Sequence, residues 1–165
     1  MTQLDWQTYF ASLAAEHVSL RHTLQQPHFF RGELEEFFSG FRSRVNFPAL
    51  IFESSLLDVG GDVPNQHQRR TMAIIVTQTH TRDDWGEIAS ALAQCETIGL
   101  DLLGRLQHDI AETDTGDLSQ CRLLDIHGEP LSNQPDKYVG WRFEFVVQEK
   151  ACLFHPTNFQ PASNE

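Results

Sequence analysis

The spacing of apolar residues predicts one long amphipathic helix over residues 82–112. The apolar positions fall mostly three or four apart, on one stripe of a 3.6-residue helix; they are Trp85, Ile88, Leu92, Cys95, Leu102, Leu106 and Ile110. Thr81 and Asp84 have the spacing of a capping box, which marks the expected start of the helix. Gly99 and Gly104 lie inside it and predict close helix–sheet approach, because a mid-helix glycine costs about 1 kcal/mol against alanine.

Two further helices are predicted before this one, over residues 4–24 and 32–44. The first begins with capping-box spacing at Thr2 and Asp5, and Pro27 follows its end. Its apolar stripe contains Trp6, Phe10, Leu13, His17, Leu20 and Leu24. In the second, glutamates crowd the start and Arg42 and Arg44 the end, an order that complements the helix dipole.

Four stretches predict β-strands, over residues 47–58, 71–80, 118–127 and 138–150. The last shows the clearest alternation: Trp141, Phe143, Phe145 and Val147 share one face, and Arg142, Glu144, Val146 and Gln148 share the other. Alternation of this kind indicates one buried face and one face that reaches solvent or a partner. Turn residues at 128–130 and 132–136 separate the last two predicted strands.

The stretch Val59–Arg70 is polar and contains Gly60-Gly61, so it predicts a long connection between the first two strands. Connections of about twelve residues are uncommon and often functional. Together with the polar face of the last strand, this loop supplies the predicted partner contacts, which are Gly60, Gly61, Asp62, Arg69, Arg70, Arg142, Glu144 and Gln148.

These elements predict an α+β fold, with a mainly antiparallel sheet of about four strands packed on one long helix and extra helices at the N-terminus. No shift in composition marks a second domain. We therefore expect a single domain over residues 1–156 and a mobile C-terminal tail over residues 157–165, which is rich in polar residues and proline.

The composition of the chain disfavours some classes of function. The chain has 165 residues, 40% of them apolar, and a net charge of −11, which predicts a folded domain and disfavours a surface for nucleic-acid phosphates. Arg42 with Arg44, and Arg69 with Arg70, are the only candidate basic patches. No apolar run is long enough to span a membrane, and the start of the sequence does not resemble a signal peptide.

The sequence offers no catalytic or metal-binding signature. His17 and His22 are five residues apart on the predicted helix, so they cannot hold one ion together. The pair Asp83-Asp84 is typical of a helix start, and Asp109, Glu112, Asp114 and Asp117 are typical of a solvated turn. Phosphate-binding, dinucleotide-binding and hydrolase motifs are missing. We therefore expect no enzyme activity, cofactor or metal.

The three cysteines, Cys95, Cys121 and Cys152, are widely separated, and the sequence contains no CxxC pair. They predict reduced and partly buried thiols in a cytoplasmic protein. Cys95 lies on the apolar stripe of the long helix. For Cys121 and Cys152 the sequence leaves open whether a histidine lies close enough to activate the thiol.

The order of these elements resembles the tail-terminator or tail-completion proteins of tailed bacteriophages and related prophages. The resemblance runs over residues 47–156: a strand FPALIFES, a loop, a strand TMAIIVTQ, a long helix with CETIG, a strand ending in GWRFEFVV, and the segment ACLFHP at 151–156. It implies an α+β domain without a cofactor that assembles with itself as a hexameric ring.

The same resemblance implies the partners and the location. Such a ring would cap the tail tube, contact the tube protein and the head-completion or connector proteins, and form part of the virion tail after assembly in the host cytoplasm. It would bind no membrane and no specific nucleic-acid sequence, although DNA would pass through it.

Two alternative functions remain open. The chain could be a small-ligand-binding or enzymatic domain similar to the NTF2-like cone, with the Trp141, Phe143 and Phe145 face lining a pocket and His80 or Asp84 as polar groups. It could also be a secretion-type chaperone or adaptor, a class that the acidic charge allows.

Overall fold

The computed structural model describes residues 1–32, 45–62, 66–81, 84–133 and 138–150. Most of the predicted helix over 32–44, the predicted tail over 157–165, and Cys152 lie outside the described residues. Among the described residues, no helix has the length and apolar character needed to cross a membrane.

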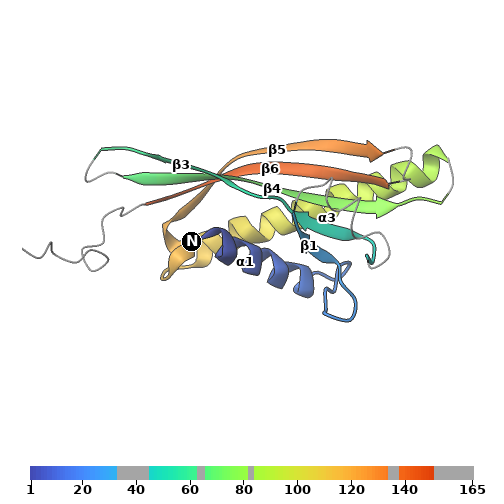
Figure 1. The fold of residues 1–165 in the computed structure, drawn as a ribbon, viewed down its shortest axis with the longest axis horizontal. Helices are drawn as coiled ribbons and strands as arrows, with labels where there is room; N and C mark the ends of the chain where they lie inside the picture. The colour runs from blue at the N-terminus through green and yellow to red at the C-terminus, as the bar shows by residue number, and fades with distance from the viewer. Residues whose placement is uncertain (33–44, 63–65, 82–83, 134–137, 151–165) are drawn as a thin grey trace, which may run out of the picture.

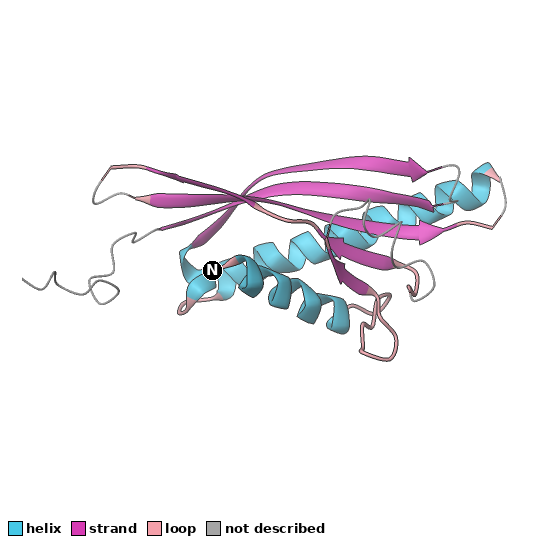
Figure 2. Ribbon diagram, in the orientation of Figure 1, coloured by secondary structure: helices cyan, strands magenta, loops and turns pink. Residues whose placement is uncertain are grey.

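The described residues form a six-stranded sheet with two α-helices on one face (Figures 1 and 2). In chain order the elements are α1 (Gln3–Glu16), β1 (Phe29–Arg31), β2 (Ala49–Phe52), β3 (Leu56–Gly60), β4 (His67–Thr79), α3 (Trp85–Glu112), the 3-10 helix η1 (Asp117–Gln120), β5 (Cys121–Asn133) and β6 (Tyr138–Lys150). The strand order is β1-β2-β4-β6-β5, with β3 also paired to β4.

The α+β class is confirmed, but the sheet has more strands than the predicted four. All neighbouring strands are antiparallel except β1 and β2, which are parallel. The sequence missed β1 because it is only three residues long, too short to show a period of two.

The main core lies between the sheet and the two helices. Trp6 and Phe10 of α1 are fully buried, as are Phe52 of β2 and Phe145 of β6. The rings of Phe10 and Phe52 stack with centroids 5.2 Å apart. Side chains from both ends of the sequence therefore fill this space, which binds α1 to the centre of the sheet.

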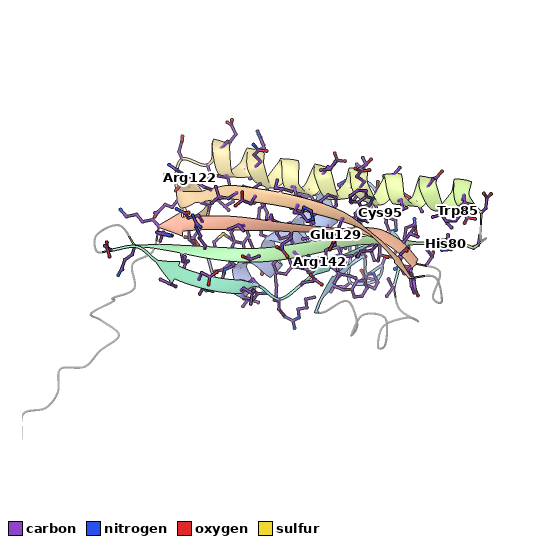
Figure 3. All side chains as sticks on the ribbon, turned by 90° about the horizontal axis from the view of Figure 1, so that it is seen from above. His80, Trp85, Cys95, Arg122, Glu129 and Arg142 are labelled. Carbon is purple, nitrogen blue, oxygen red and sulfur yellow. The ribbon has the colours of Figure 1, made fainter. Side chains whose placement is uncertain are left out.

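Helix α3 packs its predicted stripe against the sheet, with one exception at its start. Asp84 caps the helix by accepting a hydrogen bond from the Gly86 backbone N–H at 2.9 Å, whereas the predicted capping box at Thr81 is wrong. Trp85 is 78% exposed because the first turn of the helix lies beyond the end of the sheet (Figure 3). Local periodicity cannot tell where the sheet ends.

The two helix glycines have different roles. A Cβ atom at Gly99 would lie 2.1 Å from the ring of Phe143 on β6, so this glycine permits the close approach that the sequence predicts. A Cβ at Gly104 would meet no atom within 4 Å. The prediction is therefore correct for Gly99 and wrong for Gly104.

Helix α1 is shorter than predicted. Its capping box at Thr2 and Asp5 is confirmed, but the helix ends at Glu16 and not near residue 24. The His22 N–H donates to the Ala14 carbonyl at 3.0 Å, which closes the helix end. Leu20 still reaches the core, whereas Leu24 is 92% exposed. The apolar spacing continues to residue 24 in the sequence, but the chain leaves the helix after Glu16.

The predicted strand over 47–58 is two strands, and the predicted loop Val59–Arg70 is mostly a β-hairpin. Both β2 and β3 pair with β4 along the same side. Strand β3 continues to Gly60, and β4 already begins at His67. Polar residues in this stretch predicted a loop. They lie in strands because they pair with a neighbouring strand, and such pairing can outweigh a low intrinsic preference for β-structure.

The last two strands show the same effect. The predicted bounds of β6 are confirmed. Strand β5, in contrast, runs from Cys121 to Asn133 and includes the glycine and proline that predicted a turn. Because β5 pairs with β6 alone among the described strands, Pro130 lies on an edge, where a missing N–H is tolerated.

The outer face of the sheet, opposite the helices, carries a second and smaller core. Ala49, Ile51 and Ile75 are fully buried there and contact apolar residues that include Phe30 and Phe47. In the part of the sheet that contains β1 and β2, the outer face is therefore apolar and buried, which the alternation over residues 138–150 did not predict.

Candidate functional site

One end of the sheet differs from the rest, and we call it the distal half. It comprises Leu56–Gly60 of β3, residues 67–71 of β4, residues 146–150 of β6 and residues 121–124 of β5, paired in that order. The β3–β4 hairpin projects beyond both helices (Figure 1).

Strand β3 is exposed along its whole length, although its residues are largely apolar. Leu56 is 72% exposed, Leu57 48% and Val59 47%. Apolar side chains on a strand with an open edge are a recognised site for pairing with another chain. Sequence reasoning assigned Leu56 and Leu57 to a strand and Val59 to a loop, and it missed their exposure because it could not show that the helices stop short of the hairpin.

A row of polar residues crosses the outer face of the distal half. In register across the sheet it contains Asp58, Arg69, Gln148 and Arg122. The Arg69 Nε donates to the Gln148 side-chain oxygen at 3.0 Å. The structure therefore brings two predicted contact residues together and adds Asp58 and Arg122, which the sequence did not single out.

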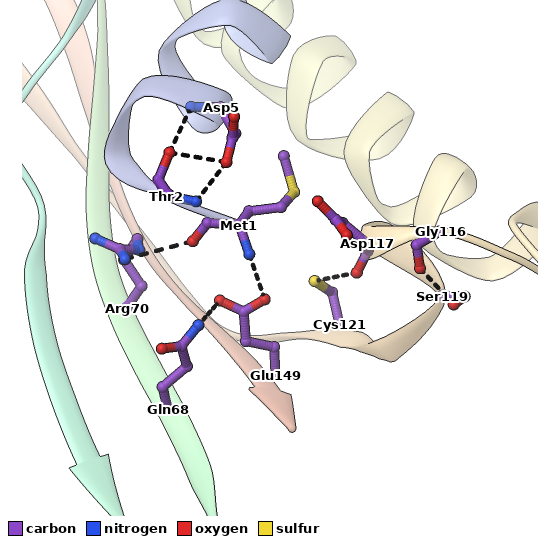
Figure 4. A network of polar contacts seen from close by, with 10 residues as sticks. All are labelled: Met1, Thr2, Asp5, Gln68, Arg70, Gly116, Asp117, Ser119, Cys121 and Glu149. Carbon is purple, nitrogen blue, oxygen red and sulfur yellow. Dashed lines mark hydrogen bonds and ion pairs between the residues drawn. The ribbon is translucent and has the colours of Figure 1, made fainter. Parts of the chain in front are cut away.

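Arg70 lies on the opposite face from Arg69 and is only 8% exposed. It donates to the Ser55 hydroxyl at 2.9 Å. It also donates to the Met1 carbonyl at 3.5 Å (Figure 4). Its side chain therefore joins the hairpin to the start of α1, although the sequence predicted a partner contact.

Glu149 completes this network. It accepts from the Gln68 amide and forms an ion pair with the Met1 amine at 2.7 Å (Figure 4). Both partners of the ion pair have side chains only 9% exposed. The inner face of the distal half is thereby fixed to α1 by polar contacts where apolar packing ends.

The remaining predicted contacts fall into two groups. Gly60, Gly61 and Asp62 lie at the exposed end of β3, and Gly61 has a φ of 90°, which favours glycine. Arg142 and Glu144 lie on the outer face of β6. The Arg142 guanidinium binds Glu53 at 2.9 Å and Glu144 at 3.1 Å. Glu129 of the neighbouring strand lies 3.9 Å away (Figure 3). These charges are largely satisfied within the chain.

The cysteines of the described residues lack the features of a nucleophile. Both Cys95 and Cys121 are buried and free. Burial raises the pKa of Cys95 to about 12 and that of Cys121 to about 11, the latter also through the charge of Glu149. Both thiols therefore stay protonated at neutral pH, and a protonated thiol is a poor nucleophile.

Other titratable groups serve the fold. Burial and a 2.8 Å hydrogen bond to Asp109 raise the pKa of the Tyr9 hydroxyl, which links α1 to α3. No group of three or more histidine, cysteine, aspartate or glutamate side chains in the described ranges is placed to hold a metal ion.

Two residues of the aromatic face that the NTF2-like alternative assigns to a ligand, Phe143 and Phe145, are buried against the helices. Phe143 lies against Gly99 of α3, and Phe145 lies against Phe10 with ring centroids 5.8 Å apart. Asp84, a proposed polar group of the pocket, caps α3. The surface hollow beside Cys121 is open and is lined by ends of β4, β5 and β6 with residues of η1.

Comparison with known proteins finds no family model that matches this chain and no curated protein that matches it.

Proposed function

We propose that this chain is a structural assembly protein of a phage or phage-like tail. In this proposal it forms a homo-oligomeric ring, of six copies as the resemblance implies, that caps the tail tube and joins it to the head-proximal connector. The observation that carries the proposal is the projecting β3–β4 hairpin with its exposed Leu56, Leu57 and Val59.

Two further features support this proposal. Apart from Arg70, the predicted contact residues are exposed or lie on the face of the sheet away from the main core, so contact with partners would leave the core intact. Polar contacts also join separate parts of the fold, such as Arg70 with Ser55 and Tyr9 with Asp109. A preformed domain suits assembly, because it loses little conformational entropy on binding.

Size-exclusion chromatography followed by native mass spectrometry tests the oligomer. We expect a single closed species of defined copy number, and a strict monomer at all concentrations would contradict the proposal.

Binding to a tail-tube protein of the same phage or prophage tests the function. We expect the oligomer to bind the end of preformed tubes and to stop their elongation, measured as a shorter tube length by electron microscopy. A small-ligand domain or a secretion chaperone would leave tube length unchanged.

A further inference from the structure

The distal half of the sheet has two open edges of similar length. On one side, Leu56–Gly60 of β3 pairs with β4, and on the other side residues 121–124 of β5 pair with β6. Among the described strands, neither stretch has a second neighbour. The regular stretch of β5 ends at Leu124, where the register shifts before His127. Each edge therefore offers a short, regular run of backbone groups.

The directions of the strands make these two edges compatible. Strand β3 is antiparallel to β4, β4 to β6, and β6 to β5, so β3 and β5 run in opposite directions. When a second copy lies beside the first in the same orientation, its β3 is antiparallel to the β5 of the first. Antiparallel pairing of two short strands needs no further change in the chain.

The side chains also match when the rows of the sheet continue straight into the next copy. A row here means the four residues that lie in register across β3, β4, β6 and β5. The first residue of each row is on β3 and the last is on β5, and these end residues are Leu56 and Leu124, Leu57 and Leu123, Asp58 and Arg122, and Val59 and Cys121. The same four pairs would therefore face each other across the contact between copies. They comprise two leucine pairs, one pair of opposite charges, and one valine with a thiol.

We propose that β5 of one copy pairs with β3 of the next copy in this register, so that the distal halves form one continuous sheet across the oligomer. This inference rests on the proposed function only in assuming that copies of the chain assemble. It identifies the contact, which the resemblance leaves open.

Charge favours a head-to-tail contact over a symmetric one. Asp58 and Arg122 are both exposed, and the head-to-tail contact pairs them. An antiparallel β3–β3 pair centred on the strand would instead place two Asp58 carboxylates opposite each other, which is unfavourable. A head-to-tail contact repeated by rotation closes into a ring, whereas a two-fold contact gives a dimer.

The rest of β5 is protected against pairing. Asp125 has a positive φ of 42° at the irregularity, and Pro130 lacks an N–H. Irregularities and prolines are common means of blocking an open edge. The regular part of β5 that remains open is the part whose side chains match β3.

Cysteine pairing tests the register. The double variant L56C/L124C places one thiol on each edge of the outer face, and mild oxidation should give a ladder of covalent oligomers on a non-reducing gel. The matched control is L56C/E129C, whose second thiol lies on the same strand and face but several rows away. We expect no ladder from this control, from either single variant or from the oxidised wild-type chain.

A charge exchange tests the direction of the contact. D58R and R122E should each reduce assembly, because each places like charges opposite each other between copies. An equimolar mixture should restore it, since the arginine introduced by D58R then faces the glutamate introduced by R122E. At the next contact the native Asp58 and Arg122 face each other. Circular dichroism checks that both variants are folded. The inference would be overturned if the single variants assembled as well as the wild type, or if the mixture stayed dissociated.

The outcomes separate this inference from the proposed function. A closed oligomer that gives no ladder with L56C/L124C refutes the β3–β5 contact and leaves the ring in place. A ladder from open chains that never close supports the contact and refutes the ring. A monomer without cross-links refutes both.

Discussion

Strand β4 passes through two different environments, and the contrast separates the residues that hold the fold from those that are free for contact. Residues Met72–Thr77 are buried, because the helices cover the inner face of the sheet and the cluster around Ile75 covers the outer face. Residues 67–71 of the same strand are mostly half-buried or exposed, apart from Arg70. The ladder with β6 continues through both parts.

Hydrogen bonding therefore extends further than the core does. In the buried half, apolar packing determines stability. In the distal half, the strands are held by their backbone bonds and by polar contacts with the start of α1, and apolar side chains remain free to bind. The following predictions test this division, beginning with the largest expected effect.

The largest difference in stability between the buried half and the distal half should appear when a core aromatic side chain is truncated. Phe145→Ala removes a fully buried ring that contacts Phe10 and should lower the free energy of unfolding by about 3–5 kcal/mol. Leu57→Ala in the hairpin should change it by less than about 0.5 kcal/mol, as for other surface positions. Urea denaturation followed by circular dichroism measures both. Equal losses would show that the hairpin belongs to the core.

The two glycines of α3 form a matched pair within one helix. Gly99→Ala should destabilise the protein by about 1–3 kcal/mol, because the new methyl group overlaps the Phe143 ring and the site is already packed. Gly104→Ala should stabilise it by about 1 kcal/mol through helix propensity, since the position is open. Melting temperatures of the two variants should therefore move in opposite directions; a shift in the same direction would contradict this packing.

Substitutions of the neighbours Arg69 and Arg70 test the outer and inner faces of the distal half separately. Arg70→Ala should cost about 1–3 kcal/mol, because it removes the buried guanidinium that donates to the partly buried Ser55 hydroxyl and leaves that hydroxyl without this hydrogen bond. Arg69→Ala should stay within about 0.5 kcal/mol of the wild type. Chemical denaturation of both variants is the measurement. The inner-face role assigned to Arg70 fails if the two variants are equally stable.

A smaller and pH-dependent effect is expected at the loop between α1 and β1. The His22 Nδ1 accepts the backbone N–H groups of His28 and Phe29 at 3.1 and 3.3 Å. Burial and the neighbouring His28 lower the pKa of His22 below its ordinary 6.5. The unfolded chain therefore binds this proton more readily than the folded chain.

It follows that the stability contributed by His22 is present above about pH 6.5 and is lost as the pH falls below it. Melting temperatures between pH 5 and pH 8 measure this loss. His22→Asn retains an acceptor but cannot titrate, so it should show a weaker dependence on pH. An unchanged dependence would assign the effect to other groups.

Local pattern determined much of this protein. The period of two over residues 138–150 predicted β6 with its bounds and its buried face, and the capping box predicted the start of α1. The apolar stripe predicted α3, because the burial of one helix face requires apolar residues three or four apart. Gly99 was also interpreted correctly, as a point of close helix–sheet contact.

Tertiary structure decided where these elements stop and which surfaces stay open. Leu24 and Trp85 continue their stripes in sequence, yet both are exposed because the chain turns or the sheet ends there. Arg69 and Arg70 are adjacent arginines in a stretch that reads as a polar loop, and their inclusion in β4, between β3 and β6, places them on opposite faces. Periodicity reports the local contacts of each residue, whereas exposure depends on neighbours that are distant in the chain. For that reason the open edges of β3 and β5, and the match between them, emerged only from the assembled sheet.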